Sequence, residues 1–137
     1  MAIGDIGGTG QIYVGFYDGG TWRYPATGFT PTANTWYHIV GTYDGANMYT
    51  YVNGSVVASV AFTGGFGGTS NSLGFNIGKR WDGTTSGYYF NGSIGEVRAY
   101  NRPLTSTEVT QNYNATKYRY QTANQTLVKP AQKYGQL

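Results

Sequence analysis

Residues Trp36 to Ser59 read WYHIVGTYDGANMYTYVNGSVVAS. Two tight-turn signals, Asp44-Gly45 and Asn53-Gly54, divide these residues into three runs rich in Tyr, Val, Ile and Thr, which suit a pleated and half-buried surface. A two-residue type I′ turn needs positive φ at both central positions, and Asn followed by Gly tolerates this best. The pattern predicts a three-stranded antiparallel meander.

The composition is typical of a single all-β domain. The 137 residues include 22 Gly and 14 Tyr, and only 11% are charged, which favours many turns over a helical or disordered chain. No apolar run approaches the length of a membrane span, and the first residues lack the pattern of a signal peptide. The absence of Cys excludes disulfides, thiolate nucleophiles and thiolate metal sites.

Further strands are expected on both sides of the meander. Upstream, residues Gln11 to Tyr17 alternate with a period of two, and Asp18-Gly19-Gly20 turns the chain back into Thr21 to Tyr24. Downstream, we expect a short strand at Leu73 to Ile77, a loop at Gly78 to Gly87, and a strand at Tyr88 to Tyr100 that contains a turn or bulge at Asn91-Gly92.

One short helix is predicted near the C-terminus. Thr105 and Glu108 have the spacing of a capping box, and Leu104 and Val109 have the spacing of a hydrophobic staple. The helix is expected to run from about Ser106 to Asn114 and to pack on a sheet edge.

The C-terminal residues carry all of the net positive charge. Up to Thr116, five basic residues stand against six acidic ones, whereas residues 117–137 contain four basic residues and no acidic one. We therefore divide the chain into a β-sandwich at 1–116 and an extended basic arm at 117–137 that docks onto another protein. No known nucleic-acid-binding module surrounds the arm, so nucleic acid is not the expected partner. The residues expected to dock are Lys117, Tyr118, Arg119, Tyr120, Lys129 and Lys133.

Four motifs resemble the laminin-G-like, concanavalin A-like jelly-roll domain. They are WYHIVGTYDG, YVNGSVVAS, FNIGKRWDG and YYFNGSIGEVRAYNRPLTSTEV, and they lie in the order and spacing of that family between Gly10 and Asn114. The resemblance implies an antiparallel jelly-roll β-sandwich with one short C-terminal helix and an extended tail. Full domains of the family begin with several further strands, and residues 1–10 are too short to replace them.

Catalysis is not expected. Endoglucanases of the same superfamily need two neighbouring carboxylates, whereas Glu96 has Ile94 and Arg98 two residues away and Glu108 is explained as a helix cap. The sole His, His38, lies within a predicted strand, where we expect a hydrogen-bonded core imidazole.

No cofactor is expected, with Ca²⁺ as the alternative. Related domains often hold Ca²⁺ at a loop rim, and Asp18, Asp44 and Asp82 have the carboxylates for it. All three precede Gly, which is ordinary turn chemistry without an ion.

A polysaccharide is a second candidate ligand, because sugar rings stack on aromatic side chains and their hydroxyls bond to polar ones. Equally, these aromatic residues would suit the interior of the sandwich or a subunit interface. The candidate residues are Trp22, Arg80, Trp81, Asp82, Tyr88 and Tyr89.

A sandwich without its first strands exposes unpaired backbone groups and an apolar face. The sequence therefore predicts a non-enzymatic structural or decoration subunit, which docks through an open sheet edge and the arm to copies of itself or to capsid or tail proteins. The ending QNYNATKYRY resembles laminin-G-like structural proteins of tailed bacteriophages, which implies a location in the virion. The alternative is a glycan-binding adhesion module that is extracellular or on a cell surface.

Overall fold

Eight short strands and one helix make up the part of the chain that the computed structural model describes, which is residues 2–4, 10–17, 21–64, 77–80 and 88–121. No helix within these ranges is long and apolar enough to cross a membrane. In chain order the elements are β1 (Ala2–Gly4), β2 (Tyr13–Tyr17), β3 (Trp22–Arg23), β4 (Ile39–Tyr43), β5 (Asn47–Val52), β6 (Ser55–Ala61), β7 (Lys79–Arg80), β8 (Tyr88–Tyr89) and α1 (Ser106–Gln121).

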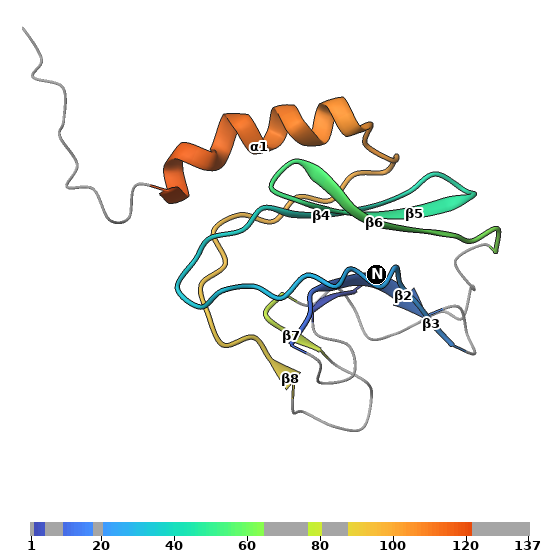
Figure 1. Cartoon of the computed structure of the whole chain (residues 1–137), viewed down its shortest axis with the longest axis horizontal. Helices are drawn as coiled ribbons and strands as arrows, with labels where there is room; N and C mark the ends of the chain where they lie inside the picture. Colours follow the sequence, from blue (N-terminus) through green and yellow to red (C-terminus); the bar gives the residue numbers. More distant parts are fainter. Residues whose placement is uncertain (1, 5–9, 18–20, 65–76, 81–87, 122–137) are drawn as a thin grey trace, which may run out of the picture.

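The strands form antiparallel sheets arranged in layers. β1, β2 and β3 make one sheet, β4, β5 and β6 make a second, and β7 pairs with β8. Figure 1 shows α1 on one side of the β4–β5–β6 sheet and the β1–β2–β3 sheet on the other. The result is a mostly β architecture with one C-terminal helix, whereas the complete jelly-roll sandwich remains a prediction.

The predicted meander is confirmed. Tyr43 pairs with Met48 and Val52 with Ser55, so the strand boundaries fall at the two turn signals. Asn53 and Gly54 have φ of 50° and 84°, the positive values that a type I′ turn requires. The Asn53 side chain also accepts a hydrogen bond of 3.0 Å from the backbone N–H of His38, which fixes the turn to the start of β4.

The core lies between the two three-stranded sheets. Val14 and Phe16 of β2 and Met48 and Thr50 of β5 are fully buried there. Gly41 of β4 faces Val14, and a Cβ at that position would overlap the valine side chain. The absence of a side chain at Gly41 therefore sets how closely the sheets approach.

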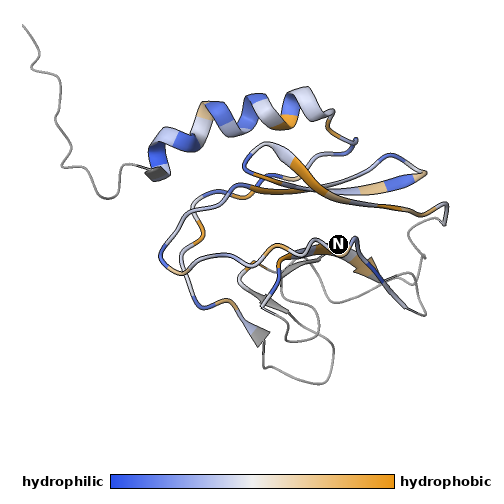
Figure 2. Ribbon diagram, viewed as in Figure 1, coloured by the Kyte–Doolittle hydropathy of each residue, from blue (hydrophilic) through white to orange (hydrophobic). Residues whose placement is uncertain are grey.

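The opposite face of the meander is covered by α1. Tyr51, Leu104 and Val109 form a buried cluster, so the predicted hydrophobic staple also packs on the sheet. The Thr110 hydroxyl donates a 2.9 Å hydrogen bond to the carbonyl of Gly54 at the meander turn. Figure 2 shows that α1 is mostly hydrophilic along its length, as expected for a helix with one buried stripe.

The predicted capping box is confirmed. The backbone N–H of Glu108 donates to the Thr105 hydroxyl at 3.2 Å, and the Glu108 carboxylate accepts from the Thr105 backbone N–H at 2.8 Å. Arg102 adds two hydrogen bonds to the same carboxylate, of 3.0 and 2.6 Å. These contacts, the Arg102 guanidinium first and then Thr105, lower the pKa of Glu108 to about 2.

The helix is longer than predicted, and the prediction of an extended chain from residue 117 was wrong for its first part. α1 continues to Gln121 because Thr116 is buried and Tyr120 packs on Trp36, with 4.8 Å between ring centroids. The buried side of α1 is a stripe of residues at helical spacing, namely Val109, Tyr113, Thr116 and Tyr120. A count of apolar residues does not detect this stripe, because Thr116 is polar. Residues 122–137 lie outside the described ranges.

The predicted strand at Tyr88 to Tyr100 was also wrong over most of its length. Only Tyr88–Tyr89 is a strand, and the residues that follow belong to no described sheet, because alternation alone does not supply the partner strand that a ladder needs. The predicted loop beginning at Gly78 contains β7, and β1 was not predicted at all. Most of the expected strand at Leu73 to Ile77 lies outside the described ranges.

We predict that Gly41→Ala destabilises the protein by about 1–3 kcal/mol, because the new methyl group must push the two sheets apart at Val14. The free energy of unfolding in urea measures this. Val14→Ala makes room for the methyl group, so the Val14→Ala/Gly41→Ala double variant should lose less than the sum of the single variants. Strict additivity would show that these two residues do not set the sheet separation.

We predict that Glu108 stabilises the fold above pH 4.5, its ordinary pKa, and that this contribution disappears as the pH falls towards about 2, its pKa in the folded protein. Glu108→Gln keeps the capping box but removes the charge that Arg102 binds. Urea unfolding between pH 5 and pH 2 should therefore show wild type losing its advantage over Glu108→Gln. An advantage that does not change with pH would contradict the assignment.

Candidate functional site

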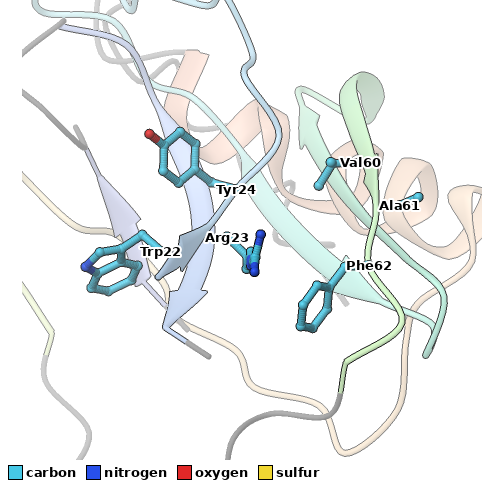
Figure 3. A pocket seen from close by; sticks show the side chains of 6 residues that line it. All are labelled: Trp22, Arg23, Tyr24, Val60, Ala61 and Phe62. Atoms are coloured by element: carbon cyan, nitrogen blue, oxygen red, sulfur yellow. The ribbon is translucent and has the colours of Figure 1, made fainter. Parts of the chain in front are cut away.

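A hollow of about 190 Å³ opens where the end of β6 approaches β3. Figure 3 shows its lining, with Trp22, Arg23 and Tyr24 on one side and Val60, Ala61 and Phe62 on the other. The two sides belong to different sheets, so the hollow exists only because the sheets pack face to face.

Aromatic contacts fix both walls of this hollow. Phe62 packs edge-on against the buried Phe16 at 4.7 Å, and Tyr24 packs edge-on against Tyr13 at 4.9 Å. The guanidinium carbon of Arg23 lies 5.7 Å from the centre of the Phe62 ring, a cation–π distance. An aromatic face can stack on a sugar ring and a guanidinium can bond its hydroxyls, although about 190 Å³ is less than the ~300–1,000 Å³ of most ligand pockets.

The structure only partly gathers the predicted glycan-binding residues. Trp22 lines the hollow, whereas Tyr89 is exposed in the separate β7–β8 sheet. Arg80 lies opposite Tyr88 in that small sheet. Trp81 and Asp82 fall outside the described ranges. Sequence reasoning missed Phe62, because its contact with Arg23 depends on packing between sheets and leaves no local signal.

A larger hollow of about 440 Å³ lies between the start of α1 and the meander, and its lining includes Tyr49, Tyr51, Val56 and Leu104. Its one acidic lining residue, Asp44, already serves the turn, since its carboxylate accepts hydrogen bonds from two backbone N–H groups at 2.9 and 2.7 Å. These bonds lower the pKa of Asp44. With the Asp44 carboxylate already bonded in the turn, the hollow offers a ligand mainly apolar side chains.

The described residues bring together no group of three or more His, Asp or Glu side chains that could hold a metal ion. Of the candidate Ca²⁺ ligands, Asp44 is the turn residue just described. Asp18 and Asp82 lie outside the described ranges, so the Ca²⁺ alternative remains untested there.

His38 differs from the expected hydrogen-bonded core residue. Its ring is half-buried near Tyr113, and its Nδ1 atom has no hydrogen-bond partner among the described residues. Burial lowers the pKa of His38, the positive charge of Arg98 lowers it further, and Glu96 partly opposes them. The imidazole is accordingly held in its neutral form at pH 7.

Residues 91–100, which we call the open segment, are all exposed and belong to no described sheet. The last backbone bond before this segment runs from the N–H of Phe90 to the carbonyl of Gly78 at 2.8 Å. Glu96 and Arg98 form the predicted ion pair, with 2.7 Å between the Glu96 Oε1 and Arg98 Nε atoms. Because they are two residues apart and in contact, their side chains share one face of the segment.

The expected docking residues of the arm have two different positions in α1. Tyr118 and Arg119 are exposed on the helix surface, whereas Tyr120 is half-buried against Trp36. Lys117 donates a 2.8 Å hydrogen bond to the Asn114 side chain within the helix. Lys129 and Lys133 lie outside the described ranges, so docking by the arm remains a prediction.

Comparison with known families identifies the class of this protein. Residues 3–110 match the laminin G-like family described as the concanavalin A-like lectin/glucanases superfamily, and the chain belongs to that family. The match includes the meander, the hollow beside Trp22 and the open segment.

A solved structure shares the fold. It is the 2.1 Å crystal structure of residues 221–444 of an S-layer domain-containing protein from Clostridium thermocellum ATCC 27405, with a TM-score of 0.52 and 24% identity. The similarity covers 68% of this chain and 45% of that one, so the chain spans less than half of that structure. The search of curated proteins gave no match.

Proposed function

We propose that this protein is a non-enzymatic structural subunit of an assembly outside the cell, and that it binds neighbouring subunits through the open segment. One observation carries the proposal: ten consecutive residues, among them Ile94, Val97 and Tyr100, are exposed and belong to no described ladder. Unpaired backbone beside apolar side chains favours addition of a strand from another chain.

The surroundings of the described carboxylates support a non-enzymatic role. Glu96 is paired with Arg98, Glu108 caps α1, and Asp44 accepts two backbone hydrogen bonds in a turn. A glycosidase needs two carboxyl groups that face one another across a substrate. Each of these three is instead occupied by a structural contact.

For the setting, we propose a virion, where this chain serves as a decoration or tail subunit of a bacteriophage. The C-terminal resemblance to phage structural proteins supports this setting. A cell-surface layer is the second setting, and the fold shared with an S-layer domain-containing protein supports it. Both place the protein in an array of repeated subunits, where an open strand has neighbours.

The hollow beside Trp22 supports a second function, recognition of a glycan. Its rigid aromatic walls and the Arg23 guanidinium offer stacking and hydrogen bonding to one sugar ring. In this role the chain would be an adhesion module, and its binding site would lie away from the open segment.

Two measurements together decide between these functions. An antibody against this chain, viewed by electron microscopy on particles and cell envelopes of the source organism, should show regular labelling if the protein is a structural subunit. A glycan array probed with wild type, Trp22→Ala and the exposed aromatic control Tyr118→Ala tests adhesion. Under the structural proposal none of the three binds an array glycan.

Absence of regular labelling would contradict the structural proposal. Glycan binding by wild type that falls at least about tenfold in Trp22→Ala, but not in Tyr118→Ala, would establish the adhesion function instead.

A further inference from the structure

The open segment is self-complementary about Val97. Residues 94–100 read IGEVRAY, so positions equally distant from Val97 hold an apolar pair, a pair of small residues and a pair of opposite charges. These pairs are Ile94 with Tyr100, Gly95 with Ala99, and Glu96 with Arg98.

We infer that two copies of this chain pair antiparallel through residues 94–100, about a two-fold axis at Val97. In this register Glu96 lies opposite Arg98 of the partner subunit, Ile94 opposite its Tyr100, and Val97 opposite its counterpart. Directly opposed charges and aliphatic–aromatic neighbours are both favourable cross-strand pairs. A two-fold interface requires a surface that matches itself, and this segment does.

The exposure of the side chains fits an uncovered interface. Ile94, Val97 and Tyr100 are 46%, 46% and 47% exposed, although they are large and apolar. Strand pairing would also give hydrogen-bond partners to backbone groups that have none in a described ladder.

The segment is already held in place for pairing. The Tyr120 ring lies against Gly95, where a Cβ would come within 2.6 Å of the tyrosine oxygen, and Tyr120 in turn packs on Trp36. Contact with α1 thus anchors the segment without providing a ladder. A segment fixed before binding loses less conformational entropy when its partner arrives.

A second copy explains the sequence better than an unrelated strand does. An unrelated strand could pair with a segment that carries apolar and charged side chains in any order. Pairing with a second copy is different, because positions 96 and 98 then lie opposite each other and must carry opposite charges. This inference rests on the proposed structural role, and it names the partner.

The test uses two opposite charge reversals in the full chain. In a homodimer of Glu96→Arg, positions 96 and 98 both carry arginine and face each other across the interface, so they repel. In a homodimer of Arg98→Glu, the same two positions both carry glutamate and repel in the same way. An equimolar mixture of the two variants restores both opposed pairs between chains, but no ion pair between positions 96 and 98 within either chain. Sedimentation equilibrium measures dimerisation of wild type, each variant and the mixture, with Gln111→Arg on the exposed surface of α1 as a charge control and circular dichroism as a check of folding.

We expect wild type and Gln111→Arg to dimerise alike, each reversal at positions 96 and 98 to weaken dimerisation by about tenfold or more, and the mixture to recover it. A wild-type chain that remains monomeric, including one that binds only a different protein, would overturn the inference. Single variants that dimerise like wild type, or a mixture that does not recover, would do the same.

These results are independent of the labelling experiment. A monomeric chain that still labels particles regularly would remove the two-fold contact and keep the structural role. A dimer without labelling would keep the contact and remove the role.

Discussion

The β4–β5–β6 meander depends on cover over both of its faces. On one face Gly41 lets Val14 of β2 come close, and on the other Leu104 and Val109 pack against Tyr51. Both faces are thus largely covered, and on the helix side the apolar hollow of about 440 Å³ remains open. The other described features that a ligand or partner can reach are the hollow beside Trp22, at the border between the sheets, and the open segment.

The open segment follows from the same arrangement. α1 crosses the meander and reaches Gly95 through Tyr120, so the helix that covers the sheet also positions residues 91–100. The segment is anchored through side chains, whereas its backbone belongs to no described ladder. Such an edge promotes aggregation of an isolated chain but serves assembly, because an added strand pairs the backbone N–H and C=O groups that point towards it.

Features that depend on neighbouring residues could be predicted from the sequence. Asn53-Gly54 fixes its turn through positive φ, Thr105 and Glu108 cap the helix, and Glu96 reaches Arg98 on the same face of the chain. Features that depend on packing between residues far apart in the sequence could not be predicted. The continuation of α1 to Gln121 depends on the contacts of Tyr120 with Trp36 and Gly95. The hollow depends on the packing of Phe62 against Arg23, which belongs to a different sheet.

The strand prediction at Tyr88 to Tyr100 shows the same limit. Alternation indicates that a segment can be extended, but whether it becomes a strand depends on a partner that the alternation does not reveal. The candidate glycan residues were likewise chosen for their chemistry, and of these only Trp22 is placed by the structure in the hollow between the sheets.

Hydrogen exchange of individual backbone amides, followed as the protein concentration is raised, tests most directly whether the open segment waits for a partner. The account predicts that amides of residues 94–100 exchange almost as fast as in an unfolded chain at low concentration, and that alternate amides, those directed at the partner strand, become protected as concentration rises. Amides of β5 should stay protected throughout. Protection of residues 94–100 that is already strong at low concentration and does not change would contradict the account.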